Sequence, residues 1–386
     1  MLELPPLSLY LHIPWCVRKC PYCDFNSHQS GAELPEADYV KAILEDLRRS
    51  LPLVQGRRLQ SIFIGGGTPS LFQPGAFDTL LRAFEKQIGF EPDIEITMEA
   101  NPGTFEQRRF LGYRSAGINR LSIGIQSFSD LHLQQLGRIH GREEALCAVA
   151  MARQAGFDNI NLDLMHGLPG QTPMDASQDL MTAMDLDPEH LSWYQLTIEP
   201  NTEFYSRPPV LPEDDALADI QQHGERLLRN GGYRQYEVSA YASRPQRRSR
   251  HNLNYWTFGD YLGLGAGAHG KITLPDQGHI LRFNKTRLPR HYLEHMAAQD
   301  GGADGGAKTI KQDDLPLEYM MNCLRLVEGT DLKLFEPRTG LKLARIASPL
   351  KILQNQGLIS TEGDMLRTTE TGQRYLNQVL ESFVNL

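Results

Sequence analysis

The feature that most constrains the fold is an alternation of short apolar runs with longer amphipathic segments over the first half of the chain. The apolar runs have the length and β-branched composition of buried strands. The segments between them have helical spacing and good helix formers. The predicted strands are Leu7–Ile13, Ser61–Ile64, Asp93–Met98, Asn119–Ile125, Asn159–Met165 and His190–Ile198, and the predicted helices are Ala37–Leu51, Pro74–Lys86, Phe105–Ala116, Arg142–Ala155 and Met174–Leu186.

This alternation predicts an α/β fold with a parallel sheet built from βαβ units. Six such units are too few to close an eight-stranded barrel, so we expect an open, partial (β/α)6 barrel of the TIM type. In folds of this kind ligands bind at the C-terminal ends of the strands. Functional motifs should therefore follow the predicted strands directly.

The pattern changes after the proline-rich segment that begins at Pro208. We expect a barrel core over 1–207, a barrel extension and linker over 208–306, and a C-terminal unit over 307–386. The extension contains the strand-like runs Tyr236–Ala242 and Tyr261–Leu264, and the glycine-rich stretch Gly301–Ala307 is predicted to be a flexible connector. The C-terminal unit has the order helix, helix, short strand (Met365–Thr368), helix, which predicts a small α-helical, winged-helix-like domain. It carries no basic recognition helix, so we expect partner docking or a structural role there instead of DNA reading.

Composition excludes several classes of function. Hydrophobic residues make up 40% of the chain and charged residues 22%, which is enough apolar material for a large core. The formal net charge is −8, whereas a nucleic-acid binder usually carries a basic excess, so no nucleic-acid partner is expected. No apolar run approaches the ~20 residues that span a bilayer, and the start lacks the pattern of a signal peptide. We therefore expect a cytoplasmic protein, with any membrane association peripheral, at the inner membrane.

Three of the five cysteines form the pattern C-x3-C-x2-C on the loop after the first predicted strand: Cys16, Cys20 and Cys23. Without a secretion signal, an odd number of cysteines argues against a disulfide framework. Closely spaced thiolates bind soft metals. A closed zinc site would need a fourth ligand, for which His12 or His28 is available. An iron–sulfur cube held by only three thiolates would instead keep one iron open for another ligand.

Polar motifs follow the other strands at the same end. The second strand leads into the run Gly65-Gly-Gly-Thr-Pro, whose glycines allow close approach of a ligand to the backbone. The third ends at Glu99, a carboxylate able to accept hydrogen bonds from ribose hydroxyls. The fourth leads to Gln126, and the fifth passes through Asp163 into His166-Gly-Leu-Pro-Gly. The repeated placement predicts one ligand site at the mouth of the barrel.

These motifs together resemble the radical S-adenosylmethionine (SAM) superfamily. The resemblance implies a [4Fe–4S] cluster on Cys16, Cys20 and Cys23, with the methionine amino and carboxylate groups of SAM on the open iron. The cluster of that family passes an electron to the sulfonium. The resemblance also implies a set of residues around SAM, in which a purely structural role stays equally open for Asp163: Tyr10, Tyr22, Gly66, Gly67, Thr68, Glu99, Gln126, Arg138 and Asp163.

Within that superfamily the chain resembles the branch of oxygen-independent coproporphyrinogen III dehydrogenase, through segments such as LHIPWC, CPYCDFNS, IFIGGGTPS and EANPG. The dehydrogenase carries a further cysteine two residues after the third, where this chain has Phe25, and a long extension before its cluster motif. Here the first cluster cysteine is already residue 16. Both departures resemble the heme-chaperone group of the branch.

The segment His251-Asn-Leu-Asn-Tyr-Trp256 is a candidate heme site. Imidazole is a common axial ligand of heme iron, and Tyr255 and Trp256 offer flat apolar faces for a porphyrin edge. The residues alone also allow a histidine satisfied within the fold, with aromatic neighbours in the core. The nearby Arg247, Arg248 and Arg250 could pair with propionates or form a solvated basic loop. The family resemblance favours heme binding at His251, Tyr255 and Trp256.

The predicted function is that of a heme chaperone, which binds heme and a SAM-liganded cluster and transfers heme to acceptor hemoproteins of respiration. Expected partners are heme, those acceptors at the membrane surface, a heme donor such as bacterioferritin, and a second copy in a homodimer. The alternative is a radical SAM enzyme that decarboxylates coproporphyrinogen III oxidatively, and a third possibility is a zinc-stabilised α/β protein. Cys147 and Cys323 are expected to be small buried hydrophobes.

Overall fold

A computed structural model describes residues 1–31, 33–103, 108–298 and 304–384 of the chain. All six predicted strands of the core are present, within a few residues of their expected bounds. Each pairs in parallel with the next in chain order, which confirms the open (β/α)6 arrangement. They are β1 (Leu7–Ile13), β4 (Leu59–Gly66), β5 (Phe90–Ala100), β6 (Arg120–Gln126), β7 (Ile160–His166) and β8 (His190–Gln195).

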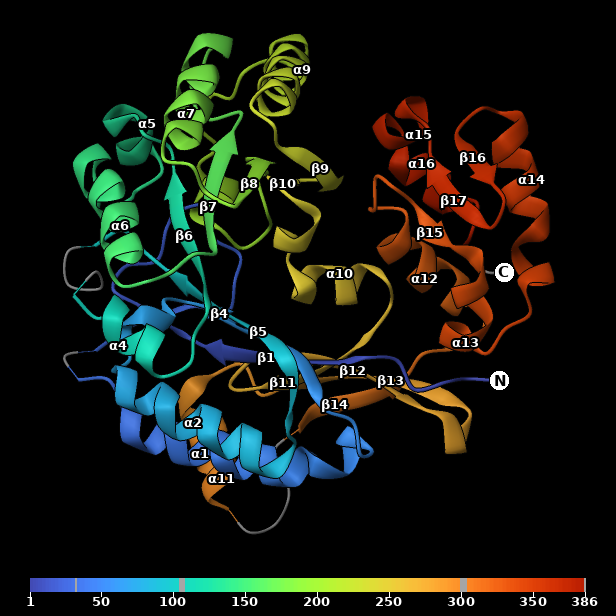
Figure 1. The fold of residues 1–386 in the computed structure, drawn as a ribbon, viewed down its shortest axis with the longest axis horizontal. Helices are drawn as coiled ribbons and strands as arrows, with labels where there is room; N and C mark the ends of the chain where they lie inside the picture. Colours follow the sequence, from blue (N-terminus) through green and yellow to red (C-terminus); the bar gives the residue numbers. More distant parts are fainter. Residues whose placement is uncertain (32, 104–107, 299–303, 385–386) are drawn as a thin grey trace.

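Helices between these strands cover the outer face of the sheet (Figure 1). Four of the five predicted helices match closely: α1 (Glu36–Ser50), α2 (Pro74–Gln87), α6 (Arg142–Gln154) and α7 (Pro173–Asp185). The fifth, predicted at Phe105–Ala116, is the shorter α4 (Phe110–Ser115), while 104–107 lie outside the described residues. Further helices in the described part of the barrel region are α5 (Asp130–Gln135), α8 (Glu203–Ser206), α9 (Asp214–Asn230) and α11 (Pro289–Ala297).

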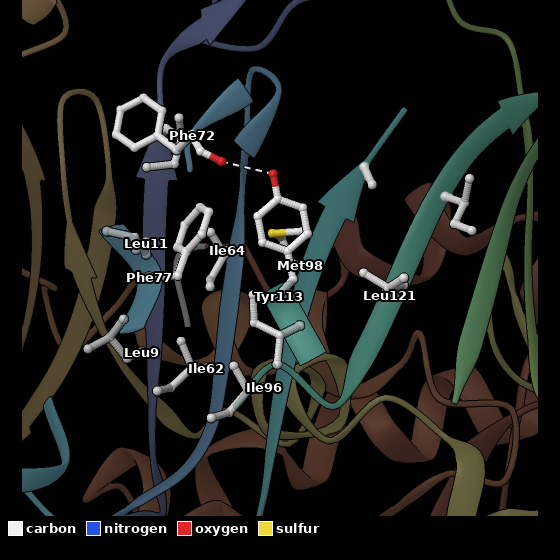
Figure 2. Packing of buried hydrophobic residues seen from close by; sticks show 14 of the residues in the cluster. Leu9, Leu11, Ile62, Ile64, Phe72, Phe77, Ile96, Met98, Tyr113 and Leu121 are labelled. Atoms are coloured by element: carbon white, nitrogen blue, oxygen red, sulfur yellow. Dashed lines mark hydrogen bonds between the residues drawn. The ribbon is translucent and has the colours of Figure 1, made fainter. Parts of the chain in front are cut away.

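The two faces of the barrel strands differ in chemistry. Alternate residues of β1, such as Leu9 and Leu11, point outward into a large apolar core beneath the helices, with Ile62 and Ile64 of β4 beside them. Figure 2 shows this layer, in which the Tyr113 hydroxyl donates a hydrogen bond to the carbonyl oxygen of Phe72 at 2.8 Å. The residues between, such as Ser8, Tyr10 and His12, point to the inner face. The outer face therefore holds the fold together, and the inner face is left for polar chemistry.

The sheet continues beyond the core on both sides. Next to β1 lie β11 (Asp260–Leu264), β12 (His269–Leu274), β13 (His279–Lys285) and β14 (Asp304–Thr309), and next to β8 lie β10 (Ala240–Ala242) and β9 (Arg234–Glu237). Its edge strands are β14 and β9, so the sheet stays open. A short parallel pair, β2 (Trp15–Cys16) and β3 (His28–Gln29), forms on the loop after β1.

Two predictions for the extension are wrong. The run Tyr236–Ala242 was expected to be one strand, but it contains the turn of an antiparallel hairpin, because β9 and β10 pair with each other across Val238 and Ser239. The expected flexible connector Gly301–Ala307 is in part a strand: 301–303 lie outside the described residues, and the rest lies in β14, whose backbone pairs with β13. Glycine composition alone did not reveal that partner. The predicted Tyr261–Leu264 strand is present as β11.

The C-terminal unit has its own apolar core and a three-stranded sheet, as expected of a winged-helix-like domain. The predicted strand Met365–Thr368 is present as β17, paired with a strand that the sequence did not reveal, β16. The elements are α12 (Leu315–Cys323), β15 (Thr330–Asp331), α13 (Phe335–Thr339), α14 (Ala347–Asn355), β16 (Ile359–Glu362), β17, α15 (Glu370–Arg374) and α16 (Leu376–Glu381).

A short helix, α10 (Arg250–Trp256), lies between the barrel and the C-terminal unit (Figure 1). It touches the inner side of the barrel, because the Asn254 amide donates to the Ser8 hydroxyl oxygen at 3.0 Å. On its other side the Arg325 guanidinium lies over the Trp256 ring, 4.5 Å from its centroid. None of the helices in the described ranges is long and apolar enough to cross a membrane.

Candidate functional site

A cavity of about 260 Å³ opens at the C-terminal ends of the barrel strands, close to the lower end of the roughly 300–1,000 Å³ typical of small-molecule sites. The loop after β1 forms one wall, and the ends of β4 to β8 together with Arg138, on the loop between α5 and α6, form the rest. Eleven of the residues predicted to hold the cluster or SAM line it: Cys16, Cys20, Tyr22, Cys23, Gly66, Gly67, Thr68, Glu99, Gln126, Arg138 and Asp163.

The three loop cysteines are free thiols, each partly buried in the cavity wall. Cys16 lies in β2, while Cys20 and Cys23 flank a tight turn closed by the Cys23 N–H donating to the Cys20 carbonyl at 3.1 Å. Burial raises the pKa of the Cys16 thiol to about 11 and also raises the pKa of Cys23. A cationic metal centre favours the thiolate and would reverse these shifts.

The spacing of the thiols bears on the kind of metal centre. Among the described residues, no group of three or more His, Cys, Asp or Glu side chains is drawn together closely enough to hold a single metal ion. An iron–sulfur cube takes each thiolate on a different iron, so its ligands stand apart around a larger body. Both ring nitrogens of His12, a possible fourth zinc ligand, are already engaged, by the Tyr10 hydroxyl and by the Asn26 carbonyl, each at 2.9 Å. The engaged ring of His12 therefore suits a three-thiolate cluster better than a zinc site closed by His12.

The glycine loop after β4 lies against the cysteine loop. Gly67 donates its N–H to the Ile13 carbonyl at 2.7 Å, and a Cβ on Gly67 would come within 2.5 Å of the Trp15 carbonyl oxygen. Gly66 has a φ of 113°, which side chains rarely adopt. Thr68 follows, buried, and accepts a hydrogen bond from the Asn101 amide at 3.0 Å. Glycines are therefore required here for the two loops to meet beside the cavity.

Two carboxyl groups face the cavity from neighbouring parts of the sheet. Glu99 accepts the Gly66 N–H at 3.0 Å. Burial raises its pKa to about 8, and the charge of Asp163 adds to the rise. Asp163 accepts from the Ser122 hydroxyl at 2.7 Å and the Asn161 amide at 2.9 Å, and burial raises its pKa as well. A cationic ligand in the cavity would favour the ionised form of both.

Gln126 and Arg138 complete the cavity lining, and Arg138 lies against the cysteine loop. Gln126, held at a φ of 69°, accepts a hydrogen bond from the Tyr194 hydroxyl at 2.9 Å. Arg138 donates to the Asn101 side chain at 2.6 Å and lies 3.5 Å from the Cys20 sulfur. Its buried Nε has no hydrogen-bond partner among the described residues. A guanidinium beside Cys20 stabilises a thiolate there, so the donor set fits an anionic cluster.

The structure separates other predicted residues from the cavity. Tyr10 does not line it, since its hydroxyl is turned to His12. His251, Tyr255 and Trp256 lie on α10, away from the cavity lining. The His251 ring packs 5.2 Å from the Phe63 ring centroid, and burial lowers its pKa to about 4.

Tyr255 and the arginines before His251 already make contacts with other side chains of the chain. The ring of Tyr255 lies 5.0 Å from those of both Trp256 and Tyr261. Each of the three arginines before His251 pairs with a carboxylate of the chain while staying partly exposed. The pairs are Arg247 with Asp158, Arg248 with Glu328 and Arg250 with Asp93.

Two further outcomes concern cysteines. Cys323 is buried in the C-terminal unit as expected, whereas Cys147 is exposed, so its prediction as a core residue is wrong. The alanine-rich composition of α6 hid which of its faces looks outward.

The sequence reading also missed Asn101, Ser122 and Tyr194 in the cavity lining. Strand periodicity carried a signal for Ser122 and Tyr194, because each shares the inward face of its strand with polar neighbours.

Comparison with known proteins identifies the family to which the chain belongs. The model of the radical SAM superfamily matches residues 10–181, and that of the HemN C-terminal domain matches 310–375. The heme chaperone HemW of Haemophilus influenzae is 52% identical over 100% of this chain and 99% of its own length. The chain belongs to the HemW family. The HemW of Escherichia coli is 51% identical over the full length of both chains.

More distant similarity extends across the family and the fold. A mouse mitochondrial protein, radical S-adenosyl methionine domain-containing protein 1, is 40% identical over 97% of this chain and 86% of its own. The structure of coproporphyrinogen III oxidase (HemN) from Escherichia coli superimposes with a TM-score of 0.82, covering 98% of this chain and 90% of that one, at 24% identity. That similarity shows a shared fold for this HemW-family chain, including its C-terminal unit.

Proposed function

We propose that this protein is a heme chaperone. It binds heme, holds a [4Fe–4S] cluster liganded by SAM in the cavity, and transfers heme to acceptor hemoproteins of respiration. The observation that carries the proposal is the set of three half-buried thiols on one cavity wall, facing a glycine loop and two carboxyl groups. The full-length similarity to proteins named heme chaperones supports the heme-binding part.

The cavity residues suit the two cofactors. When bound, the cluster supplies an electron to the sulfonium of SAM. Glu99 is placed to accept hydrogen bonds from ribose hydroxyls. Asp163 offsets the positive charge of the sulfonium and amino groups, and Arg138 offsets the thiolate charge at Cys20.

Heme is assigned to α10, with His251 as the ligand and Tyr255 and Trp256 against the porphyrin. The neutral state of His251, which its low pKa maintains, is the form that coordinates iron. Heme must displace the contact of Trp256 with Arg325 to stack on its indole, because the guanidinium lies over that ring. Heme binding at α10 therefore requires the Arg325 side chain of the C-terminal unit to move away from Trp256.

Titration of anaerobically reconstituted protein with hemin, with and without SAM, tests the heme assignment. We expect stoichiometric binding with a Soret band that shifts on coordination. His251→Ala should weaken binding and change the spectrum, and His223→Ala, which removes an exposed histidine of α9, is the matched control. An unchanged spectrum and affinity in His251→Ala would move the ligand assignment to another residue. Failure of the unaltered protein to bind heme stoichiometrically would remove the proposed function.

The cluster assignment is tested with Cys20→Ala, compared with Cys147→Ala. Cys20 is on a loop at the cavity, and Cys147 is exposed on α6. We expect Cys20→Ala to lose the cluster, measured by iron and sulfide content and by the visible spectrum, while far-UV circular dichroism stays unchanged. Cys147→Ala should retain both. Global unfolding of Cys20→Ala alone would point to a structural metal instead.

The complete cavity also favours a second candidate, a radical SAM enzyme acting on coproporphyrinogen III. An anaerobic assay with reduced cluster, SAM and coproporphyrinogen III decides between the two. Formation of protoporphyrinogen at a catalytic rate would support the enzyme. Its absence in protein that binds cluster, SAM and heme would support the chaperone.

We further propose that the protein acts as a homodimer, takes heme from a donor such as bacterioferritin, and meets its acceptors at the inner membrane surface. Sedimentation of the cluster-loaded protein with and without SAM tests dimer formation. Heme transfer is tested by mixing the heme-loaded protein with apo-cytochrome in vesicles and following the acceptor's spectrum. A monomer in all states would contradict the homodimer. Absence of heme transfer to the apo-cytochrome would contradict delivery to acceptors at the membrane.

A further inference from the structure

A chain of hydrogen bonds runs through the barrel interior from the cavity to α10. It begins at Asp163, which lines the cavity and accepts the Asn161 amide at 2.9 Å. The side-chain oxygen Oδ1 of Asn161 lies 2.6 Å from Nδ1 of His190. Nε2 of His190 lies 2.9 Å from the Tyr236 hydroxyl, which accepts the backbone N–H of Ser249 at 3.3 Å.

The far end of this chain is the residue that starts α10. Ser249 is the N-cap, and its hydroxyl oxygen accepts the Asn252 N–H at 3.3 Å. The three intermediate side chains are each at most 2% exposed: Asn161, His190 and Tyr236. Hydrogen bonds shielded from water in this way polarise one another, by roughly 10–30% per bond. A change of charge at Asp163 therefore alters the strength of the hydrogen bond at Ser249.

The chain has a single direction of donation. The N–H of Ser249 can only donate, and the ionised Asp163 can only accept. His190 must then carry its proton on Nδ1 and accept from Tyr236 on Nε2. Burial lowers the pKa of His190 well below its ordinary value, in keeping with this neutral tautomer. Ser122 reinforces the same end, since it accepts from Asn161 at 2.7 Å and donates to Asp163 at 2.7 Å.

We propose that Asn161, His190 and Tyr236 are positioning residues that couple occupancy of the cavity to the N-terminal turn of α10. A sulfonium cation in the cavity holds negative charge on Asp163, and each donor along the chain is then drawn more strongly toward that carboxylate. The N-cap of α10 is held more firmly as a result. The inference rests on the proposed function only for the identity of the ligand as SAM.

The chain is not the only anchor of α10, so it can be broken without losing the helix. Glu95, buried on β5, accepts the backbone N–H groups of Arg250 at 3.0 Å and His251 at 3.4 Å. The backbone carbonyl of Tyr236 accepts the Val327 N–H of the C-terminal unit at 3.0 Å. A phenylalanine at 236 keeps that bond and the ring packing, and loses only the hydroxyl.

The test compares Tyr236→Phe with a matched control, Tyr233→Phe. Tyr233 is also buried and donates its hydroxyl to the Pro188 carbonyl at 2.6 Å, outside the chain. Hydrogen exchange of a peptide covering 249–256 is followed by mass spectrometry in cluster-loaded protein, with and without SAM. SAM should slow exchange about fivefold or more, the lower end of typical couplings between sites. The slowing should persist in Tyr233→Phe and disappear in Tyr236→Phe.

The same slowing in Tyr236→Phe as in the unaltered protein would overturn the proposal, as would no slowing in the unaltered protein when SAM is bound. His190→Phe, which removes both histidine bonds, serves if Tyr236→Phe does not fold. Hemin titration of the same samples separates the two claims. SAM-dependent slowing without heme binding removes the chaperone function and leaves the coupling, whereas heme binding without slowing does the reverse. Failure of cluster-loaded protein to bind SAM overturns both.

Discussion

The charge of Glu99 should control how tightly the cavity holds SAM. Glu99 accepts the Gly66 N–H at 3.0 Å, and its pKa is raised to about 8 by burial and by the neighbouring Asp163. In the proposed SAM complex, ribose hydroxyls donate to the ionised carboxylate, so binding should lower the pKa of Glu99 and release a proton. The affinity for SAM should therefore rise as the pH rises toward the pKa of Glu99 in the free protein, and level off above that pKa.

The raised pKa of Glu99 also sets the size of the pH effect on SAM affinity. With a pKa of about 8, roughly one Glu99 in eleven is ionised at pH 7 and about ten in eleven at pH 9. The contribution of Glu99 to the association constant should therefore grow about tenfold over this range, or about 1.4 kcal/mol. Asp163 shares the cavity, so its replacement should shift the midpoint downward by removing a like charge.

Anaerobic equilibrium dialysis with labelled SAM at several pH values measures this dependence in cluster-loaded protein. The amino group of SAM titrates in the same range, so the informative quantity is the affinity of the unaltered protein divided by that of Glu99→Gln. Asp179→Asn is the control, because Asp179 is a buried carboxyl group bonded to Ser127 and Phe128 outside the cavity lining. A ratio that stays flat between pH 7 and 9 would refute the reasoning.

Three further predictions concern packing and buried charge. Gly67→Ala should abolish stable cluster incorporation and cost about 1–3 kcal/mol in urea unfolding, because its Cβ meets the Trp15 carbonyl; normal cluster content would contradict this. Asp260→Asn should cost about 3–5 kcal/mol, since it leaves buried Lys271 unpaired, and a loss below about 1 kcal/mol would show that the site relaxes. Phe77→Ala should cost about 3–5 kcal/mol by opening the core beneath α2, measured by the same denaturation.

The order of the barrel elements could be predicted because each signal is local. A strand such as Leu7–Ile13 reveals itself through its own apolar run, and its neighbouring helix through its own spacing. The glycine-rich strand β14 had no such signal, because its place in the sheet comes from backbone bonds to β13 and not from apolar side chains. The hairpin of β9 and β10 was missed for a related reason, since its turn contains neither glycine nor proline.

The cavity lining was predicted well for residues that follow strands in parallel order. Chain connectivity alone brings the C-terminal ends of parallel strands to one edge, so Glu99 and Asp163 meet there. Tyr10, which only the family resemblance indicated, does not line the cavity, because it lies in the middle of β1 and its hydroxyl contacts His12. The strand-end rule does not apply to His251, because α10 follows none of the six parallel strands directly.

The sequence by itself determined the alternation of elements, the three-cysteine loop and the set of motifs at the strand ends, since these depend on spacing along the chain. Only the tertiary structure decided what those motifs face. It paired Arg248 with Glu328, exposed Cys147, and joined Asp163 to Ser249 through side chains of β7, β8 and β9. Such contacts depend on which faces of distant segments meet when the apolar core packs, and local periodicity carries no record of that choice.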